Sequence, residues 1–122
     1  MPSQKESLCH LLRIVCIVSK RYQTGYYWYA FHPHQQEFLS AGEHGFLLLS
    51  CVEGMYTYAI PNSQLTQTTE FLNVTEKEGD MYWHIHLQPA LNNKYVIPLP
   101  KKSEKLDLTP FAIPMHSNSA HS

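Results

Sequence analysis

The chain has 122 residues, of which 43% are hydrophobic, and its formal charge is -1 with the histidines neutral. A chain of this length forms one domain around one core and is too short for two. The near-neutral charge excludes the strongly basic domains that hold nucleic acid by charge alone, although a local basic patch is compatible with it.

The first regular segment is a helix predicted over residues 5–19. Ser3 and Glu6 have the spacing of a capping box in front of it. An apolar stripe follows at helical spacing: Leu8, Leu11, Leu12, Val15 and Val18. Further apolar residues widen this stripe, so we expect the helix to be buried both by the sheet and by a second copy in a homodimer, or by another protein partner. The segment is too short to cross a bilayer and contains His10 and Arg13, so we expect no membrane contact.

The cysteines indicate the cellular compartment. The chain has an odd number of cysteines and no Cys-x-x-Cys motif, which is typical of reduced thiols rather than of a disulfide framework. The three are Cys9, Cys16 and Cys51. Inside apolar runs such thiols behave as small hydrophobic side chains. We therefore expect a cytoplasmic protein with buried, free cysteines.

The middle of the chain is predicted to alternate short strands with short helices. Aromatic residues favour a strand over 26–32, and Pro33 both ends it and begins a helix that Gly42 closes. The remaining predictions are a helix over 33–41, a hairpin of strands 46–52 and 55–60 around Glu53-Gly54, and a helix over 63–68.

The last third is predicted to contain a second hairpin. The polar, acidic residues 73–80 indicate an exposed loop. Strands follow over 82–87 and 94–99, joined by a turn at Asn92-Asn93. Residues 101–107 are charged and expected to be solvated, while a few apolar residues anchor the end of the chain: Leu106, Leu108 and Phe111.

Together these elements predict an α+β fold. It has about five mainly antiparallel strands, an N-terminal helix packed on one face, and one or two short helices. Residues 1–114 are expected to form a single α+β domain, and residues 115–122 a disordered tail.

Two of the predicted strands each carry a His-x-His pair. Alternation along a strand turns Trp83, Ile85 and Leu87 toward the core and leaves Tyr82, His84 and His86 on the opposite face. If the two strands are neighbours, four imidazoles converge: His32, His34, His84 and His86. Imidazoles are ligands for zinc and other divalent transition metals, with Glu37 or His44 as additional candidates. Alternatively, two histidines act as general acid and base, or the rings line a half-buried sheet face and bond to neighbours.

A nucleic-acid or ligand contact is a further hypothesis. Exposed aromatic rings stack on bases, and basic side chains meet phosphates. The candidates are Tyr26, Trp28 and Tyr82 for stacking, and Lys20, Arg21, Lys101 and Lys102 for phosphates. The alternative interpretation places the aromatics in the core and the lysines in solvated loops.

Several blocks of the sequence resemble a widespread group of uncharacterised bacterial proteins, over residues 26–112. The blocks are Tyr27-Trp28-Tyr29-Ala30-Phe31-His32-Pro33-His34-Gln35, Phe46-Leu47-Leu48-Leu49-Ser50-Cys51, Tyr58-Ala59-Ile60-Pro61, Tyr82-Trp83-His84-Ile85-His86-Leu87 and Leu106-Asp107-Leu108-Thr109-Pro110. The order of strand, hairpin, Ile-Pro and short helix is also similar to the distal half of restriction-endonuclease-like proteins of the PD-(D/E)XK type. Those nucleases bind magnesium through an Asp and a Glu-x-Lys, whereas this chain has no Glu-x-Lys or Gln-x-Lys. The resemblance therefore implies an accessory, DNA-binding or dimerising piece without catalytic residues.

Three classes of function remain open on the sequence. The favoured one is a non-catalytic interaction or accessory module, associated with nucleic acid, in a bacterial defence or mobile-element assembly. The second is a histidine-dependent metal-binding hydrolase or nuclease that uses the paired histidines. The third is a small-ligand binding domain that uses the Tyr/His face.

Overall fold

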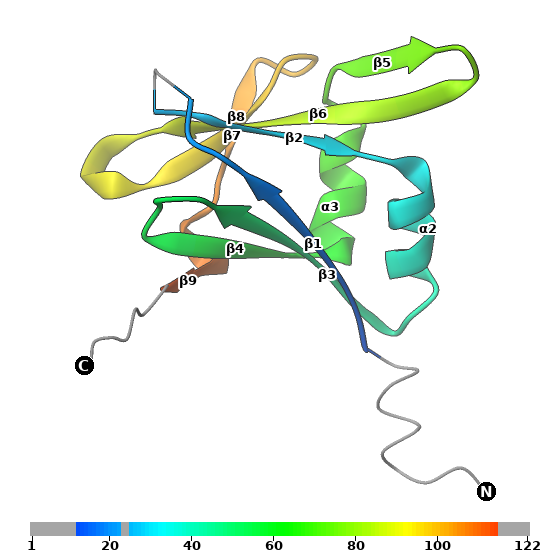
Figure 1. Ribbon diagram of the computed structural model, residues 1–122, viewed down its shortest axis with the longest axis horizontal. Helices are drawn as coiled ribbons and strands as arrows, with labels where there is room; N and C mark the ends of the chain where they lie inside the picture. Colours follow the sequence, from blue (N-terminus) through cyan, green and yellow to red (C-terminus); the bar gives the residue numbers. More distant parts are fainter. Residues whose placement is uncertain (1–11, 23–24, 115–122) are drawn as a thin grey trace, which may run out of the picture.

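The computed structural model describes residues 12–22 and 25–114, which form two β-sheets and two α-helices (Figure 1). The first sheet has the order β1-β3-β4-β9, with bounds Leu12–Ser19, His44–Cys51, Tyr56–Pro61 and Ala112–Pro114. The second has the order β2-β6-β7-β8, with bounds Tyr27–Phe31, Asp80–Pro89, Tyr95–Leu99 and Glu104–Asp107, and β5 (Val74–Lys77) pairs with β6. The helices are α2 (Pro33–Ser40) and α3 (Asn62–Thr69), and two 3-10 turns are η1 (Leu91–Asn93) and η2 (Thr109–Phe111).

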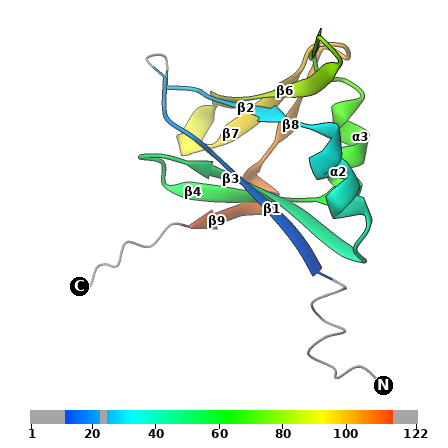
Figure 2. The ribbon, with the colours of Figure 1, turned by 45° about the vertical axis from the view of Figure 1, so that its right-hand side comes forward.

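The two sheets lie face to face as layers, and both helices close one end of the space between them (Figure 2). The β3–β4 turn and the β6–β7 connection lie together at the opposite end. The core fills the space between the layers, because alternate residues of the facing strands point inward. On β2 these are Tyr27, Tyr29 and Phe31, which are almost completely buried.

The predicted N-terminal helix is wrong over residues 12–19, which form the edge strand β1. This strand pairs in parallel with β3, from Leu12 opposite His44 to Ser19 opposite Cys51. The segment is rich in β-branched residues, which suit a pleated surface better than a helix. Its accessibility alternates with a period of two, and Ile14 and Val18 are 48% and 61% exposed on the outer face. Residues 5–11 of the predicted helix lie outside the described residues.

The predicted loop over residues 73–80 is instead part of a hairpin. β5 pairs antiparallel with β6, with Lys77 opposite Asp80. Glu78 and Gly79 connect them with positive φ angles of 51° and 83°, which is the conformation of a two-residue hairpin turn. Residues 104–107 are also predicted to be a solvated segment, but they form strand β8, which pairs with β7. The described residues therefore contain more strands than the five expected.

Other predicted elements are confirmed. Helix α2 begins at Pro33, and the hairpins β3–β4 and β6–β7 are antiparallel. Asn92 and Asn93 both have φ near 60° in the second hairpin connection. Leu108 is buried and anchors the end of the described chain, whereas the predicted tail, 115–122, lies outside it. Neither α2 nor α3, nor any other helix in the described part, is long and apolar enough to span a membrane.

Candidate functional site

The prediction that two strands each carry a His-x-His pair is right for only one of them. His84 and His86 lie on β6, whereas His32 follows the end of β2 and His34 lies in helix α2, which Pro33 begins. β2 and β6 pair antiparallel, with Trp28 opposite His86 and Ala30 opposite His84. Ile85 and Leu87 are buried and Trp83 packs against the core, so the predicted alternation along β6 is confirmed. His84 and His86 therefore look outward from the sheet, together with Tyr82.

Seven aromatic and imidazole rings form a continuous row across this face, which we name the ring file. In spatial order they are Tyr22, Tyr26, His86, His84, Tyr82, His32 and His34. Successive ring centroids are 5.1, 6.3, 6.1, 5.1, 5.5 and 5.5 Å apart. Six of the rings are partly buried and the last, His34, is exposed. These separations are those of interacting aromatic pairs.

His84 is fixed at the centre of the ring file by two hydrogen bonds. The Trp28 indole N–H donates to Nδ1 of His84 at 3.0 Å, and Nε2 of His84 lies 2.6 Å from the Thr75 hydroxyl. An indole nitrogen is only a donor, so Nδ1 of His84 must accept and Nε2 must carry the proton. The ring is therefore held in one tautomer and one orientation, with neither nitrogen free.

His86 stands next to His84 with its ring nearly parallel, at an interplanar angle of 7°. Partial burial lowers the pKa of His86, and the neighbouring His84 lowers it further. A hollow of about 430 Å³ is lined by Tyr26, His86, Gln88 and Pro89. It lies beside the second and third rings of the ring file.

The four predicted metal ligands form two separate pairs. His32 and His34 are 5.5 Å apart and His84 and His86 are 6.1 Å apart, but Tyr82 stands between the pairs. Within residues 12–22 and 25–114 no three His, Cys, Asp or Glu side chains are grouped closely enough to hold a metal ion. The hydrogen bonds of His84 also occupy both of its nitrogens. The hypothesis of one shared zinc-type site therefore finds no ligand cluster in the described structure.

The predicted nucleic-acid contacts divide between different parts of the molecule. Tyr26, Trp28 and Tyr82 share the outer face, and the Lys20 ammonium lies 5.7 Å above the Tyr22 ring at one end of the ring file. The other basic candidates lie elsewhere: Arg21 lines the space between the sheets, and Lys101 and Lys102 follow β7 beside Phe71. Lys102 also pairs with Glu104 at 3.4 Å.

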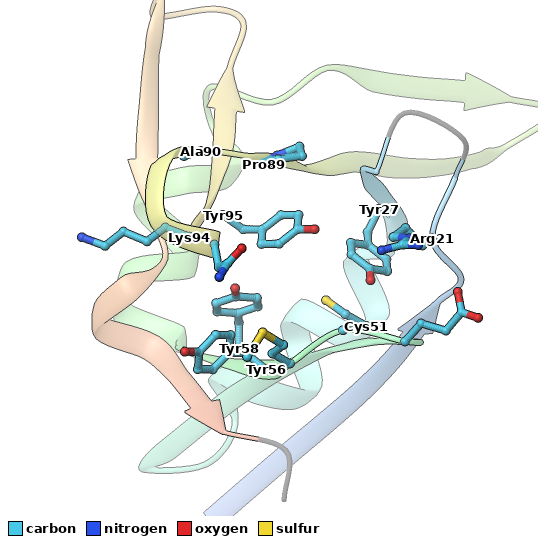
Figure 3. A pocket seen from close by; sticks show the side chains of 13 residues that line it. Arg21, Tyr27, Cys51, Tyr56, Tyr58, Pro89, Ala90, Lys94 and Tyr95 are labelled. Atoms are coloured by element: carbon cyan, nitrogen blue, oxygen red, sulfur yellow. The ribbon is translucent and has the colours of Figure 1, made fainter. Parts of the chain in front are cut away.

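A second candidate site is a cavity of about 190 Å³ between the two sheets, at the end opposite the helices (Figure 3). Tyr27 and Tyr95 enter it from the second sheet, and Cys51 and Tyr58 from the first. The Tyr95 ring lies 5.7 Å from the Tyr27 ring and 6.3 Å from the Tyr58 ring. Gly54 forms part of the wall, where a Cβ atom would lie 2.8 Å from Cβ of Cys51.

Two of the tyrosine hydroxyls at the cavity are bonded to the backbone. The Tyr27 hydroxyl donates to the Val52 carbonyl at 2.9 Å, and the Tyr95 hydroxyl donates to the Gly25 carbonyl at 3.1 Å. Burial raises the pKa of Tyr27 to about 12, and it also raises the pKa values of Tyr58 and Cys51. At neutral pH the cavity is therefore lined by protonated phenols and a protonated thiol.

Sequence reasoning missed this cavity. Cys51 was expected as a buried thiol and is 3% exposed, but Cys16, expected to be buried as well, is exposed on β1. The signal available was the alternation that turns Tyr27 and Tyr58 inward on their strands. It does not reveal that Tyr95, from a third strand, meets them at one end of the sandwich.

No protein-family model matches this chain, and neither a curated protein sequence nor a solved structure shows a significant similarity to it.

Proposed function

We propose that this protein is a non-catalytic interaction module that binds single-stranded nucleic acid along the ring file. The observation that carries the proposal is the unbroken row of seven rings. Tyr82, His84 and His86 stand on β6, and the other four rings belong to the segments just before and after β2. Unpaired bases stack on such platforms, with about 1–3 kcal/mol per base lost when an aromatic is removed. The hollow beside Tyr26 and His86 offers room for one base.

The near-zero net charge of the protein favours a single-stranded nucleic acid that is bound mainly by base stacking. The formal charge is -1, so counterion release contributes little compared with a basic domain. Lys20 stands over Tyr22 and supplies one cation at the end of the row. The bases of a duplex are stacked on one another and do not present their faces, whereas those of a single strand do.

The wider role and location are also proposals. The resemblance of the sequence blocks to a bacterial group and to nuclease-like proteins favours an accessory part in a defence or mobile-element assembly. Cys16 and Cys51 are free thiols, which supports a cytoplasmic location. A homodimer is proposed through β1, an edge strand whose outer face exposes Leu12, Ile14 and Val18.

Fluorescence anisotropy with labelled oligothymidylate and oligouridylate at low salt tests the binding proposal. Tyr82→Ala or Tyr26→Ala should weaken binding by about 5- to 150-fold, because each removes one stacking platform. Tyr82→Phe should keep most of the affinity, since it keeps the ring. The matched control is Ile113→Ala, an exposed residue of the first sheet. Absence of binding to both oligonucleotides at low salt would refute the proposal.

Sedimentation velocity tests the dimer. We expect the wild-type chain to associate as its concentration rises, and Ile14→Lys to stay monomeric because a charge opposes apolar contact at the edge strand. A wild-type chain that sediments as a monomer at every concentration would exclude the homodimer.

A further inference from the structure

We infer that the cavity between the sheets binds a small single-ring aromatic acid, with a polar ring substituent bonded to the Tyr58 hydroxyl and the carboxylate directed toward Arg21. This site lies between the two sheets, whereas the ring file lies on the outer side of the second sheet. The inference therefore does not depend on nucleic-acid binding.

The Tyr58 hydroxyl is the first observation that points to a ligand. Tyr58 is 2% exposed, and within the described part of the chain no hydrogen-bond partner is found for its hydroxyl. Tyr27 and Tyr95, in contrast, each donate to a backbone carbonyl. In Figure 3, Tyr58 rises from β4 toward Tyr95, in the interior of the cavity. Among the described residues the fully buried side-chain oxygen without a partner is Gln36 Oε1, so the Tyr58 hydroxyl oxygen borders the open space of the cavity. A ligand in that space can replace water as its hydrogen-bond partner.

The size and lining of the cavity select one aromatic ring. A dry, apolar cavity of roughly 150 Å³ holds a benzene molecule, and this cavity measures about 190 Å³. Three of its lining residues are tyrosines whose rings contact one another at 5.7 and 6.3 Å, so a further ring meets their free edges and faces on the cavity side. The thiol of Cys51 points toward the same space in Figure 3.

The charged residues of the lining favour an anionic ligand, because Arg21 and Lys94 supply two cations against the one carboxylate of Glu53. Arg21 is the cation that we assign to the ligand. Its side chain lies next to Tyr27 at one side of the cavity in Figure 3. No carboxylate among the described residues lies within ion-pair distance of it, since the ion pairs there involve His32 and Lys102. Its charge lowers the pKa values of Tyr27 and Tyr95 against the effect of burial, so its field extends into the cavity. A carboxylate meets this unpaired guanidinium, whereas an ammonium group is repelled.

The direct test uses 4-hydroxybenzoate, benzoate and phenol as probes, with binding followed by amide chemical shifts at neutral pH. 4-Hydroxybenzoate should bind most tightly, because it has both polar groups. Tyr58→Phe should weaken it by about three- to tenfold, the loss of one neutral hydrogen bond, and leave benzoate unchanged. Arg21→Gln should weaken both acids by about tenfold or more and leave phenol unchanged. Ile113→Ala, at an exposed residue of the first sheet outside both sites, is the control and should change none of these.

Alkylation of cysteines gives a second measurement that needs no variant. Saturating 4-hydroxybenzoate should slow iodoacetamide labelling of Cys51, which lines the cavity, and leave the exposed Cys16 unaffected. Cys16 is thus an internal control for any general effect of the probe. The inference is overturned if no probe gives a saturable shift at millimolar concentration, or if Tyr58→Phe leaves the preference for the hydroxylated acid unchanged. Neither result would affect the proposal that oligonucleotides bind along the ring file, which fluorescence anisotropy tests independently.

Discussion

Strand β2 places similar side chains in two opposite environments. Tyr27 and Tyr29 are each 1% exposed, and their hydroxyls donate to backbone carbonyls of the first sheet, at Val52 and Ser50. Trp28, between them in sequence, faces outward and bonds to His84 on the neighbouring strand. The inward phenols thus join the two layers, whereas the outward rings contact one another and a few polar side chains such as Thr75 and Lys20. The difference shows that strand alternation, and not residue type, decides whether an aromatic side chain stabilises this fold or is free to recognise a partner.

The largest expected effect on stability comes from replacing two adjacent residues, one facing the core and one on the ring file, by alanine. Phe31→Ala removes a ring that is 0% exposed and should lower the free energy of unfolding by about 3–5 kcal/mol. His32→Ala, one residue later and on the ring file, should cost less than about 1 kcal/mol. Urea denaturation measures both. Equal losses would show that the ring file contributes to the core and is not merely a surface.

A smaller loss is expected at the wall of the cavity. In Gly54→Ala the new Cβ would lie 2.8 Å from Cβ of Cys51 and 3.1 Å from the Tyr27 hydroxyl. Neither neighbour is the end of a flexible chain, so overpacking should cost about 1–3 kcal/mol. Met55→Ala, at a neighbouring residue that is 62% exposed, is the control and should stay within about 0.5 kcal/mol of wild type. An unchanged urea midpoint for Gly54→Ala would mean that the turn is not tightly packed.

Two tyrosines of the cavity should respond differently to loss of the hydroxyl. Tyr27→Phe breaks the bond to the Val52 carbonyl and should destabilise the protein by about 0.5–1.5 kcal/mol. Tyr58→Phe removes a hydroxyl that borders the open cavity and has no partner among the described residues, and should leave stability within about 0.5 kcal/mol of wild type. Thermal unfolding without added ligand compares them. A marked loss in Tyr58→Phe would reveal a partner for this hydroxyl within the protein.

The smallest effect is a pH dependence on the outer face. Burial and then His84 lower the pKa of His86, with the Tyr26 ring on its other side. The unfolded chain therefore binds a proton at this position more readily than the folded chain does. Stability should be fully present above the ordinary histidine pKa and should fall as the pH drops from there through the lowered folded value. His86→Gln should make the urea midpoint less sensitive to acid over that range, and an identical acid response would contradict the assigned environment.

Local patterns predicted much of the fold. Pro33 and the Asn92-Asn93 pair mark a helix start and a hairpin turn because their backbone preferences act over a few residues. The same holds for the alternation along β6, which places Tyr82 outward and Ile85 inward. The failures have a different origin. Residues 12–19 carry both helical spacing and β-branched residues, and only the parallel pairing with β3, distant in sequence, decides between them.

The sequence by itself determined which face of each strand its aromatic and histidine residues occupy, because that follows from a period of two along the chain. Only the tertiary structure decided their neighbours. Tyr82 stands between the histidine pairs and Trp28 bonds to His84 because β2 and β6 adopt one particular register. Tyr27, Tyr58 and Tyr95 enclose a cavity because strands of two sheets meet at one end of the sandwich. Such contacts join residues far apart in the chain, and no local pattern encodes them.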